Sequence, residues 1–71
     1  MQLPIAVSET EKSTLQNQVF EQIRLMIVDG RLKAGDPLPA TRELSIQMGI
    51  SRNTTMLAYE RLISEGYIYT K

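Results

Sequence analysis

Five polar residues in the second half of this 71-residue chain carry hydrogen-bonding groups close together in the sequence. They are Arg42, Ser51, Arg52, Asn53 and Thr54. An arginine guanidinium can bond guanine O6 and N7 together, an asparagine amide can bond an adenine edge, and hydroxyls can bond phosphate oxygens. The chain has no cysteine or histidine, no carboxylate pair at a suitable site and no glycine-rich phosphate loop. Neither a zinc site nor an enzyme is therefore expected.

Each of these side chains also has an ordinary structural explanation. Ser51 and Thr54 fit a helix cap and a first-turn residue first, and phosphate contacts second. Arg52 alone is typical of a solvated surface arginine, but its place in Ser-Arg-Asn-Thr after a glycine favours a base contact. Asn53 fits a base contact and a polar residue near a helix start equally well. Arg42 in the first turn of a helix would oppose the helix dipole, which favours a nearby phosphate.

Two predicted helices position these residues, and the first of them is short. Leu44 and Met48 lie four residues apart on its inner side, and Gly49 follows where a left-handed residue ends the helix. Its start is weaker, because Ala40 is a poor N-cap at a cost of about 1 kcal/mol relative to serine. Thr41 is the alternative cap one position later.

The second helix is longer, is capped by Ser51 and begins near Arg52. Its inward face is predicted from residues at i, i+3, i+4 and i+7, which are Thr55, Ala58, Tyr59 and Leu62. On this spacing Tyr59 is predicted to be core and not a stacking platform, and the methionines are predicted to fill gaps. Two helices joined by a tight glycine turn form the helix-turn-helix pattern, whose second helix enters the DNA major groove.

An earlier helix and a connector precede this pair. Ser13 and Gln16 match a capping box, and the helix is predicted to end at Asp29–Gly30. Phe20 and Met26 widen a buried stripe of residues four apart, which are Leu15, Val19, Ile23 and Ile27. Gln16, Gln22 and Arg24 are predicted to lie outside. The connector 30–39 is anchored by Leu32 and Leu38, with one very short strand as an alternative.

Both ends of the chain are predicted to be extended. Residues 1–14 are an N-terminal arm, in which 1–7 alternate loosely around Pro4, and an edge strand is the alternative. Residues 67–70 alternate β-branched and aromatic side chains as a strand does, and the hairpin partner is expected beyond Lys71, in a longer protein. Tyr67 and Tyr69 share one face of this strand, and their role is left open.

The charge balance is the feature that argues against DNA binding. Eight Lys and Arg balance eight Asp and Glu, whereas DNA-binding domains are often basic. From Arg24 to Arg52 there are five cations against three anions, which predicts a small basic patch and weak non-specific affinity. The N-terminal residues have neither a signal-peptide pattern nor a long apolar run, so a soluble cytoplasmic protein without a membrane partner is expected.

Residues 15–69 resemble the N-terminal winged helix-turn-helix domain of the GntR family of bacterial transcription regulators. The resemblance rests on GRLKAGDPLPATREL and MGISRNTTMLAYERLISEGYI, and AYERL, EGY and the arm LPIAV are most similar to the MocR branch. It implies a mainly α fold over 15–71, with three helices and a short, incomplete β-hairpin wing. It also implies operator DNA as partner, bound by a homodimer, with helix 52–65 in the major groove and the wing at the minor groove.

The resemblance places Arg42 and the cluster Ser51, Arg52, Asn53 and Thr54 at the DNA contacts. MocR regulators also carry an aminotransferase-like domain that binds pyridoxal phosphate, but nothing of that domain is found in these residues, where no cofactor is expected.

Three departures from the family pattern matter. Ala40 stands where the family often has serine, and Thr55 stands where valine is usual, so its hydroxyl needs a partner such as the carbonyl four residues back. Met56 and Leu57 replace basic or polar residues, which reduces the expected phosphate contacts. A winged-helix protein-interaction module is the alternative function. The neutral charge favours this alternative, whereas Arg42 and the Ser-Arg-Asn-Thr cluster favour DNA.

Overall fold

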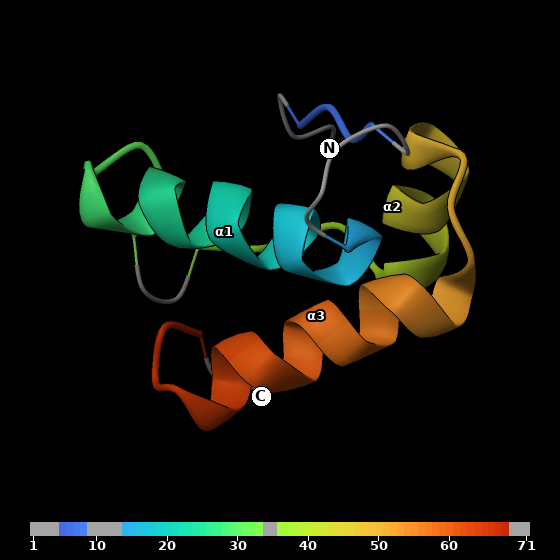
Figure 1. Ribbon diagram of the computed structural model, residues 1–71. Helices are drawn as coiled ribbons and strands as arrows, with labels where there is room; N and C mark the ends of the chain where they lie inside the picture. The colour runs from blue at the N-terminus through green and yellow to red at the C-terminus, as the bar shows by residue number, and fades with distance from the viewer. Residues whose placement is uncertain (1–4, 9–13, 34–35, 69–71) are drawn as a thin grey trace.

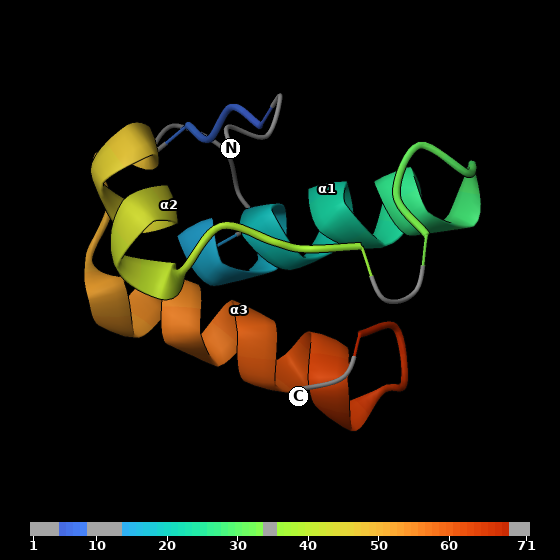
Figure 2. The same ribbon diagram turned by 180° about the vertical axis from the view of Figure 1, so that it is seen from behind.

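Residues 5–8, 14–33 and 36–68 are described by the structure, a computed structural model with three helices. They are α1 (Leu15–Val28), α2 (Thr41–Met48) and α3 (Arg52–Ser64). In both views α1 and α3 lie side by side, and α2 stands across the end at which α3 begins (Figure 1, Figure 2). The predicted mainly helical fold with three helices is therefore confirmed, and the described residues contain no β-strand.

The first helix, α1, is capped one residue later than predicted. Thr14 is the N-cap, and its hydroxyl accepts a hydrogen bond of 3.1 Å from the backbone N–H of Asn17. Gln16 is therefore not at the position that a capping box requires. The box predicted from Ser13 is wrong, and Ser13 itself lies outside the described residues. The helix ends at its C-cap Asp29, as predicted.

The hydrophobic core lies between α1 and the other two helices. The predicted stripe on α1 is confirmed, although Leu15 and Ile27 at its two ends are only half-buried. On the C-terminal side of the core, the Tyr67 ring packs edge-on against Phe20, with centroids 6.1 Å apart. Almost no surface remains exposed on eight side chains from the three helices, which are Val19, Phe20, Ile23, Met26, Leu44, Thr55, Ala58 and Leu62.

Two glutamines on α1 hold a short N-terminal segment, residues 5–8, by its backbone. The Gln22 side-chain amide donates to the Ala6 carbonyl at 2.6 Å and accepts from the Ala6 N–H at 3.2 Å. Gln18 makes the same pair of bonds to Ser8, both at 2.8 Å. The segment lies on the side of α1 away from α3 (Figure 1, Figure 2). The glutamine amides therefore bond the backbone of this segment in the way that a neighbouring strand would.

The residues between and before these pairs face the core. Ile5 is buried, and Val7 packs against the core as a partly buried side chain. Gln22 was predicted to lie on the outer side of α1, but its side chain faces the N-terminal segment. The segment is thus part of the folded domain, because it contributes both apolar burial and hydrogen bonds.

A glycine in the left-handed region ends α2, as predicted. Gly49 has φ +69° and donates its N–H to the Ile46 carbonyl at 3.3 Å. The next N–H, that of Ile50, donates to the Ser45 carbonyl at 3.1 Å. This bond pattern reverses the chain without leaving the last carbonyls of α2 unpaired. It directs the backbone into α3 within two residues.

The end of α3 uses the same device and corrects the predicted C-terminal strand. Gly66 has φ +83°, and the Tyr67 N–H donates to the Leu62 carbonyl at 2.9 Å. The Ile68 N–H points to the same carbonyl at 3.4 Å. Because these backbone groups bond back to α3, Tyr67 and Ile68 are not in a strand, and that prediction is wrong for them. Residues 69 and 70 lie outside the described part.

The connector from α1 to α2 is anchored as predicted. Leu32 is buried, and Leu38 packs against the core as a partly buried side chain. Lys33 and Asp36 close a turn, because the Lys33 N–H donates to Asp36 Oδ2 at 2.8 Å and the Asp36 N–H donates to the Lys33 carbonyl at 2.9 Å. The described residues of the connector hold no strand. None of the helices described is long and apolar enough to cross a membrane.

Candidate nucleic-acid interface

The start of α3 carries four of the five predicted site residues. Ser51 is the N-cap, as predicted, and its Oγ accepts from the Thr54 N–H at 3.1 Å. The hydroxyls of Ser51 and Thr54 also bond each other at 2.8 Å. Arg52 and Asn53 follow the cap and are exposed. The structure thus brings a hydroxyl pair, a guanidinium and an amide together on one helix turn.

The fifth residue, Arg42, is the second residue of α2 and is also exposed. The N-cap before it, Ala40, makes no side-chain cap bond, as predicted, and Glu43 accepts from the Ala40 N–H at 3.4 Å. Within the described part of the chain, Arg42, Arg52 and Asn53 have no hydrogen-bond or ion-pair partner for their side chains. These three side chains are therefore the available donors on this face.

A buried pair of hydroxyls joins α2 to α3 directly behind these donors. Ser45 Oγ and Thr55 Oγ1 are 2.9 Å apart and hydrogen bonded, and Ser45 Oγ also donates to the Thr41 carbonyl at 2.6 Å. Thr55 Oγ1 lies 3.5 Å from the Ser51 carbonyl, the partner suggested by the sequence. That expectation is confirmed, but a second and shorter bond, to Ser45, crosses to the other helix. Ser45, which lies next to Leu44 on the inner side of α2, was not predicted from the sequence.

A second contact joins the start of α2 to the middle of α3. The Tyr59 hydroxyl donates to the Pro39 carbonyl at 2.7 Å, and the ring is half-buried against the core, as predicted. Burial of the phenol, with a smaller effect from the Glu43 carboxylate, raises the pKa of Tyr59 to about 12. Together with the hydroxyl pair, this bond fixes the position of Arg42 relative to Arg52.

The basic patch expected from the sequence is smaller in the structure. Arg24 forms an ion pair with Glu21 at 2.8 Å, and Arg31 forms one with Asp29 at 2.9 Å. The hydrogen bond from Arg24 holds the pKa of the Glu21 carboxyl below its usual range. These two cations are already compensated, which leaves Arg42 and Arg52 at the starts of α2 and α3, and Lys33 in the connector, as the cations of this patch without an ion pair among the described residues.

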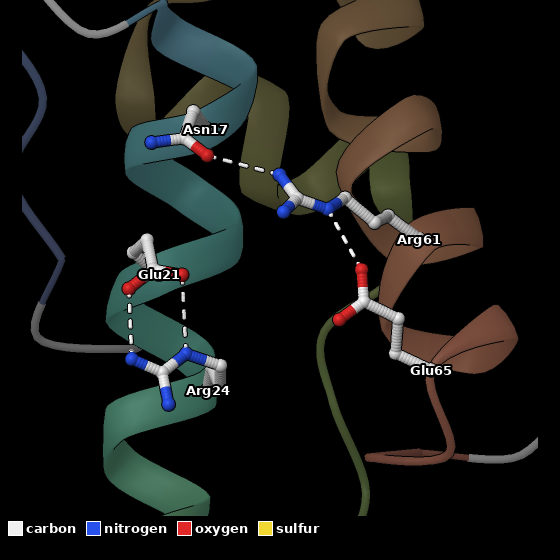
Figure 3. Close-up of polar contacts among 5 residues, drawn as sticks. All are labelled: Asn17, Glu21, Arg24, Arg61 and Glu65. Carbon is white, nitrogen blue, oxygen red and sulfur yellow. Dashed lines mark hydrogen bonds and ion pairs between the residues drawn. The ribbon is translucent and has the colours of Figure 1, made fainter.

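A further arginine, Arg61, belongs to a polar cluster between α1 and α3. It was not predicted from the sequence. Arg61 reaches from α3 to donate to Asn17 Oδ1 on α1 at 2.9 Å and pairs with Glu65 at 2.9 Å (Figure 3). Its guanidinium also lies 3.8 Å from the centre of the Phe20 ring, a cation–π contact. Arg61 therefore holds α1 and α3 together. The i, i+4 spacing to Glu65 could have predicted the ion pair, but not the bond from Arg61 to Asn17 on α1.

Two apolar side chains lie on the outer face of α3. Met56 and Leu57 are 40% and 39% exposed, so the prediction that the methionines fill gaps is wrong for Met56. Helical phase explains the difference, because positions 56 and 57 fall opposite the buried face that Thr55 and Leu62 define. The inward positions of α3 were predicted from the sequence. The same spacing also determines which residues face outward, and it was not used for that purpose.

The fold and the site together define a helix-turn-helix DNA-binding domain. A short helix, a left-handed glycine and a longer helix with donors in its first turn are the geometry that this class uses to enter a major groove. The chain belongs to the gntR family of bacterial regulatory proteins, whose family model matches residues 15–71.

Curated regulators match the same region. The chain is 46% identical over 68 residues to the pyridoxine biosynthesis transcriptional regulator PdxR of Corynebacterium glutamicum, covering 96% of this chain and 15% of that protein. It is 39% identical over 57 residues to the probable rhizopine catabolism regulatory protein MocR of Rhizobium meliloti, covering 80% of the chain and 12% of that protein. The vitamin B6 salvage pathway repressor PtsJ of Salmonella typhimurium is 46% identical over 50 residues, covering 70% and 12%.

These comparisons confirm the predicted family and its MocR-like character. They also confirm the predicted class of function, DNA-binding transcription regulation, and do not favour the protein-interaction alternative. The chain spans between a tenth and a sixth of the length of these three relatives.

Proposed function

We propose that this chain is the operator-recognition module of a transcription regulator, with α3 seated in the DNA major groove. Arg52 and Asn53 contact base edges from the first turn of α3. Arg42, at the start of α2, contacts a phosphate, and the hydroxyls of Ser51 and Thr54 add phosphate contacts after their capping role.

The observation that carries this proposal is the pair of arginines at two helix starts. Arg42 and Arg52 are exposed and have no partner among the described residues, although a cation in the first turn of a helix opposes the helix dipole. A DNA phosphate backbone offsets that cost. The bond from Tyr59 to Pro39 and the buried hydroxyl pair hold the two helix starts in one geometry. Side chains that are fixed in this way can match a fixed spacing on a duplex.

The proposal also covers the domain boundaries, the wing and the homodimer. We treat 15–71 as the winged helix-turn-helix domain and 1–14 as its N-terminal arm, and we place a short β-hairpin wing after Ile68. A homodimer in the cytoplasm would present two copies of α3 to a two-fold operator. We propose no catalytic role. Pyridoxal phosphate would bind in a MocR-type second domain of the full-length protein and not in these residues.

The test compares the chain alone with two copies joined through a flexible linker to a parallel dimeric coiled coil. One module buries only about 600–1,000 Å² on DNA, whereas tethering a second contact strengthens binding by roughly 10²–10⁴. An operator is first selected from random duplexes with the tethered dimer, and band-shift titrations at several salt concentrations then compare both proteins. We expect weak binding by the single chain and tight, salt-dependent, sequence-selective binding by the dimer.

Two results would contradict the proposal. Nanomolar binding by the single chain would show that one module is sufficient, which contradicts the need for a homodimer but not operator recognition through α3. If the tethered dimer selects no preferred sequence, the chain does not recognise an operator through α3, and the protein-interaction function becomes the better explanation.

A further inference from the structure

We infer that Met56 and Leu57 form an apolar part of the base-contact surface and recognise the 5-methyl groups of thymine. This inference rests on the proposed function, because it requires α3 to lie in the major groove. It adds a specificity element that the hydrogen-bonding residues do not supply.

Met56 and Leu57 lie on the side of α3 that faces away from the core. Thr55, Ala58 and Leu62 are fully buried and define the inner side of the helix. At about 100° per residue, Asn53 and Glu60 fall at the centre of the opposite side of the helix. Met56 and Leu57 flank this centre, one on each side around the helix axis. We call this set of four residues, Asn53, Met56, Leu57 and Glu60, the outer face of α3. All four are exposed.

Met56 lies next to the donors at the start of α3. Met56 follows Asn53 by three residues and Arg52 by four, so the three side chains are neighbours on the helix surface. Met56 lies only about 6 Å further along the helix axis than Arg52, a separation close to that of two base pairs. A helix that brings Arg52 to a base edge therefore brings Met56 within reach of a base pair about two steps away.

The chemistry of these side chains matches one group in the major groove. Base edges in the major groove offer donors, acceptors and one apolar group, the C5-methyl of thymine. An exposed methionine and leucine gain little from phosphate oxygens, and the Glu60 carboxylate on the same face is repelled by them. The outer face of α3 is thus unsuited to the DNA backbone and suited to the groove floor. Methionine adapts its shape to such a contact, because its side chain is unbranched and polarizable.

The experiment compares thymine with uracil, which forms the same hydrogen bonds but lacks the methyl group. The tethered dimer selects an operator from random duplexes, and each thymine of that operator is then replaced by uracil in turn. With the wild-type chain we expect about a fourfold loss of affinity for each methyl group that Met56 or Leu57 contacts, from the value of one buried methyl group. The replacement leaves hydrogen-bond readout unchanged.

Variants identify the side chain responsible. Met56→Ala should weaken binding to the thymine operator and remove the discrimination at one thymine position, and Leu57→Ala should do so at another. Ile63→Ala is the matched control, since Ile63 is 37% exposed on α3 but lies about 10 Å further along the axis. It should leave the thymine preference unchanged. Because all three positions are exposed and alanine favours helices, circular dichroism should show the same helix content in each variant.

The outcomes separate this inference from the proposed function. If a preferred operator is found but every uracil replacement leaves the affinity unchanged, DNA recognition stands and the methyl contact is wrong. If neither Met56→Ala nor Leu57→Ala removes the discrimination at any thymine position, the inference is also overturned. If no operator is selected at all, the proposed function fails, and the inference falls with it.

Discussion

The hydroxyl of Tyr59 donates a hydrogen bond of 2.7 Å to the carbonyl of Pro39, which lies twenty residues earlier in the chain. Pro39 immediately precedes the N-cap of α2, and Tyr59 lies in the middle of α3. One phenol therefore sets the distance between the start of α2 and the helix that we place in the major groove. The same phenol gives the domain a measurable response to pH.

We predict that stability falls between about pH 10 and pH 12. The pKa of Tyr59 is raised from 10.0 to about 12 in the folded state, so over this range the unfolded chain releases the proton while the folded chain keeps it. The stabilisation is complete below pH 10 and is lost as the pH rises through 12. Denaturant unfolding across this range should show a steeper decline for the wild type than for Tyr59→Phe. Equal slopes would mean that the phenol is not protected.

The two arginines are predicted to differ in what they contribute to binding. Arg52→Ala should cost about 1–3 kcal/mol on the operator and much less on random DNA, because it removes a base contact. Arg42→Ala should weaken both alike and lower the salt slope by about one. Arg31→Ala is the control that removes the same charge, since Arg31 comes three residues after the last residue of α1, and that end of the helix lies away from α2 (Figure 1). If both site variants lost affinity equally for the operator and for random DNA, the assignment of a base contact to Arg52 would be wrong.

Truncating the centre of the core should unfold much of the population. Leu62 is fully buried, and Leu62→Ala is expected to cost about 2–5 kcal/mol, a large share of the stability of so small a domain. Ile63→Ala, at the exposed neighbouring position, should stay within about 0.5 kcal/mol of the parent. Thermal melts of the two variants test this. Similar melting temperatures for both would contradict the helical phase of α3.

The buried hydroxyl pair should show coupling between α2 and α3. Ser45→Ala leaves the Thr55 hydroxyl with only its 3.5 Å contact to Ser51 and should cost about 1–3 kcal/mol. Thr55→Val keeps the shape of the side chain and leaves Ser45 bonded to Thr41, so it should cost less. Because both substitutions remove the same bond, the double variant should be more stable than the sum predicts. Strict additivity in urea unfolding would show that the two hydroxyls act independently.

Local chemistry explains most of what could be predicted from the sequence. The cap at Ser51, the left-handed Gly49 and the inward positions of α3 depend on residues within one or two helix turns, so spacing alone located them. The exposure of Arg52 and Asn53 could be predicted in the same way, because the helical spacing puts neither residue among the inward positions of α3. Element boundaries of this kind are set by near neighbours in the chain.

What could not be predicted depends on pairings between distant segments. The bond between Ser45 and Thr55 crosses from one helix to another, and Arg61 contacts Asn17 over a separation of 44 residues. A hydroxyl or guanidinium has many partners within reach in sequence terms, and only the packed core selects one of them. The C-terminal strand failed for a related reason. Tyr67 has the side chain of a strand residue, but its N–H bonds back to the end of α3.

The pairing of Gln18 and Gln22 with Ser8 and Ala6 makes the surface of α1 behave as the edge of a β-sheet. Because the bonds from both glutamines to Ala6 and Ser8 go to main-chain atoms, they protect alternate amides and do not depend on the side chains of these two residues. In a hydrogen-exchange experiment, the Ala6 and Ser8 amides should exchange more slowly than the Val7 amide between them. Replacing both glutamines with alanine should abolish this alternation while the amides of α3 keep their protection. The segment is thus selected by its backbone geometry, so a proline at position 6 or 8 is the substitution it should tolerate least.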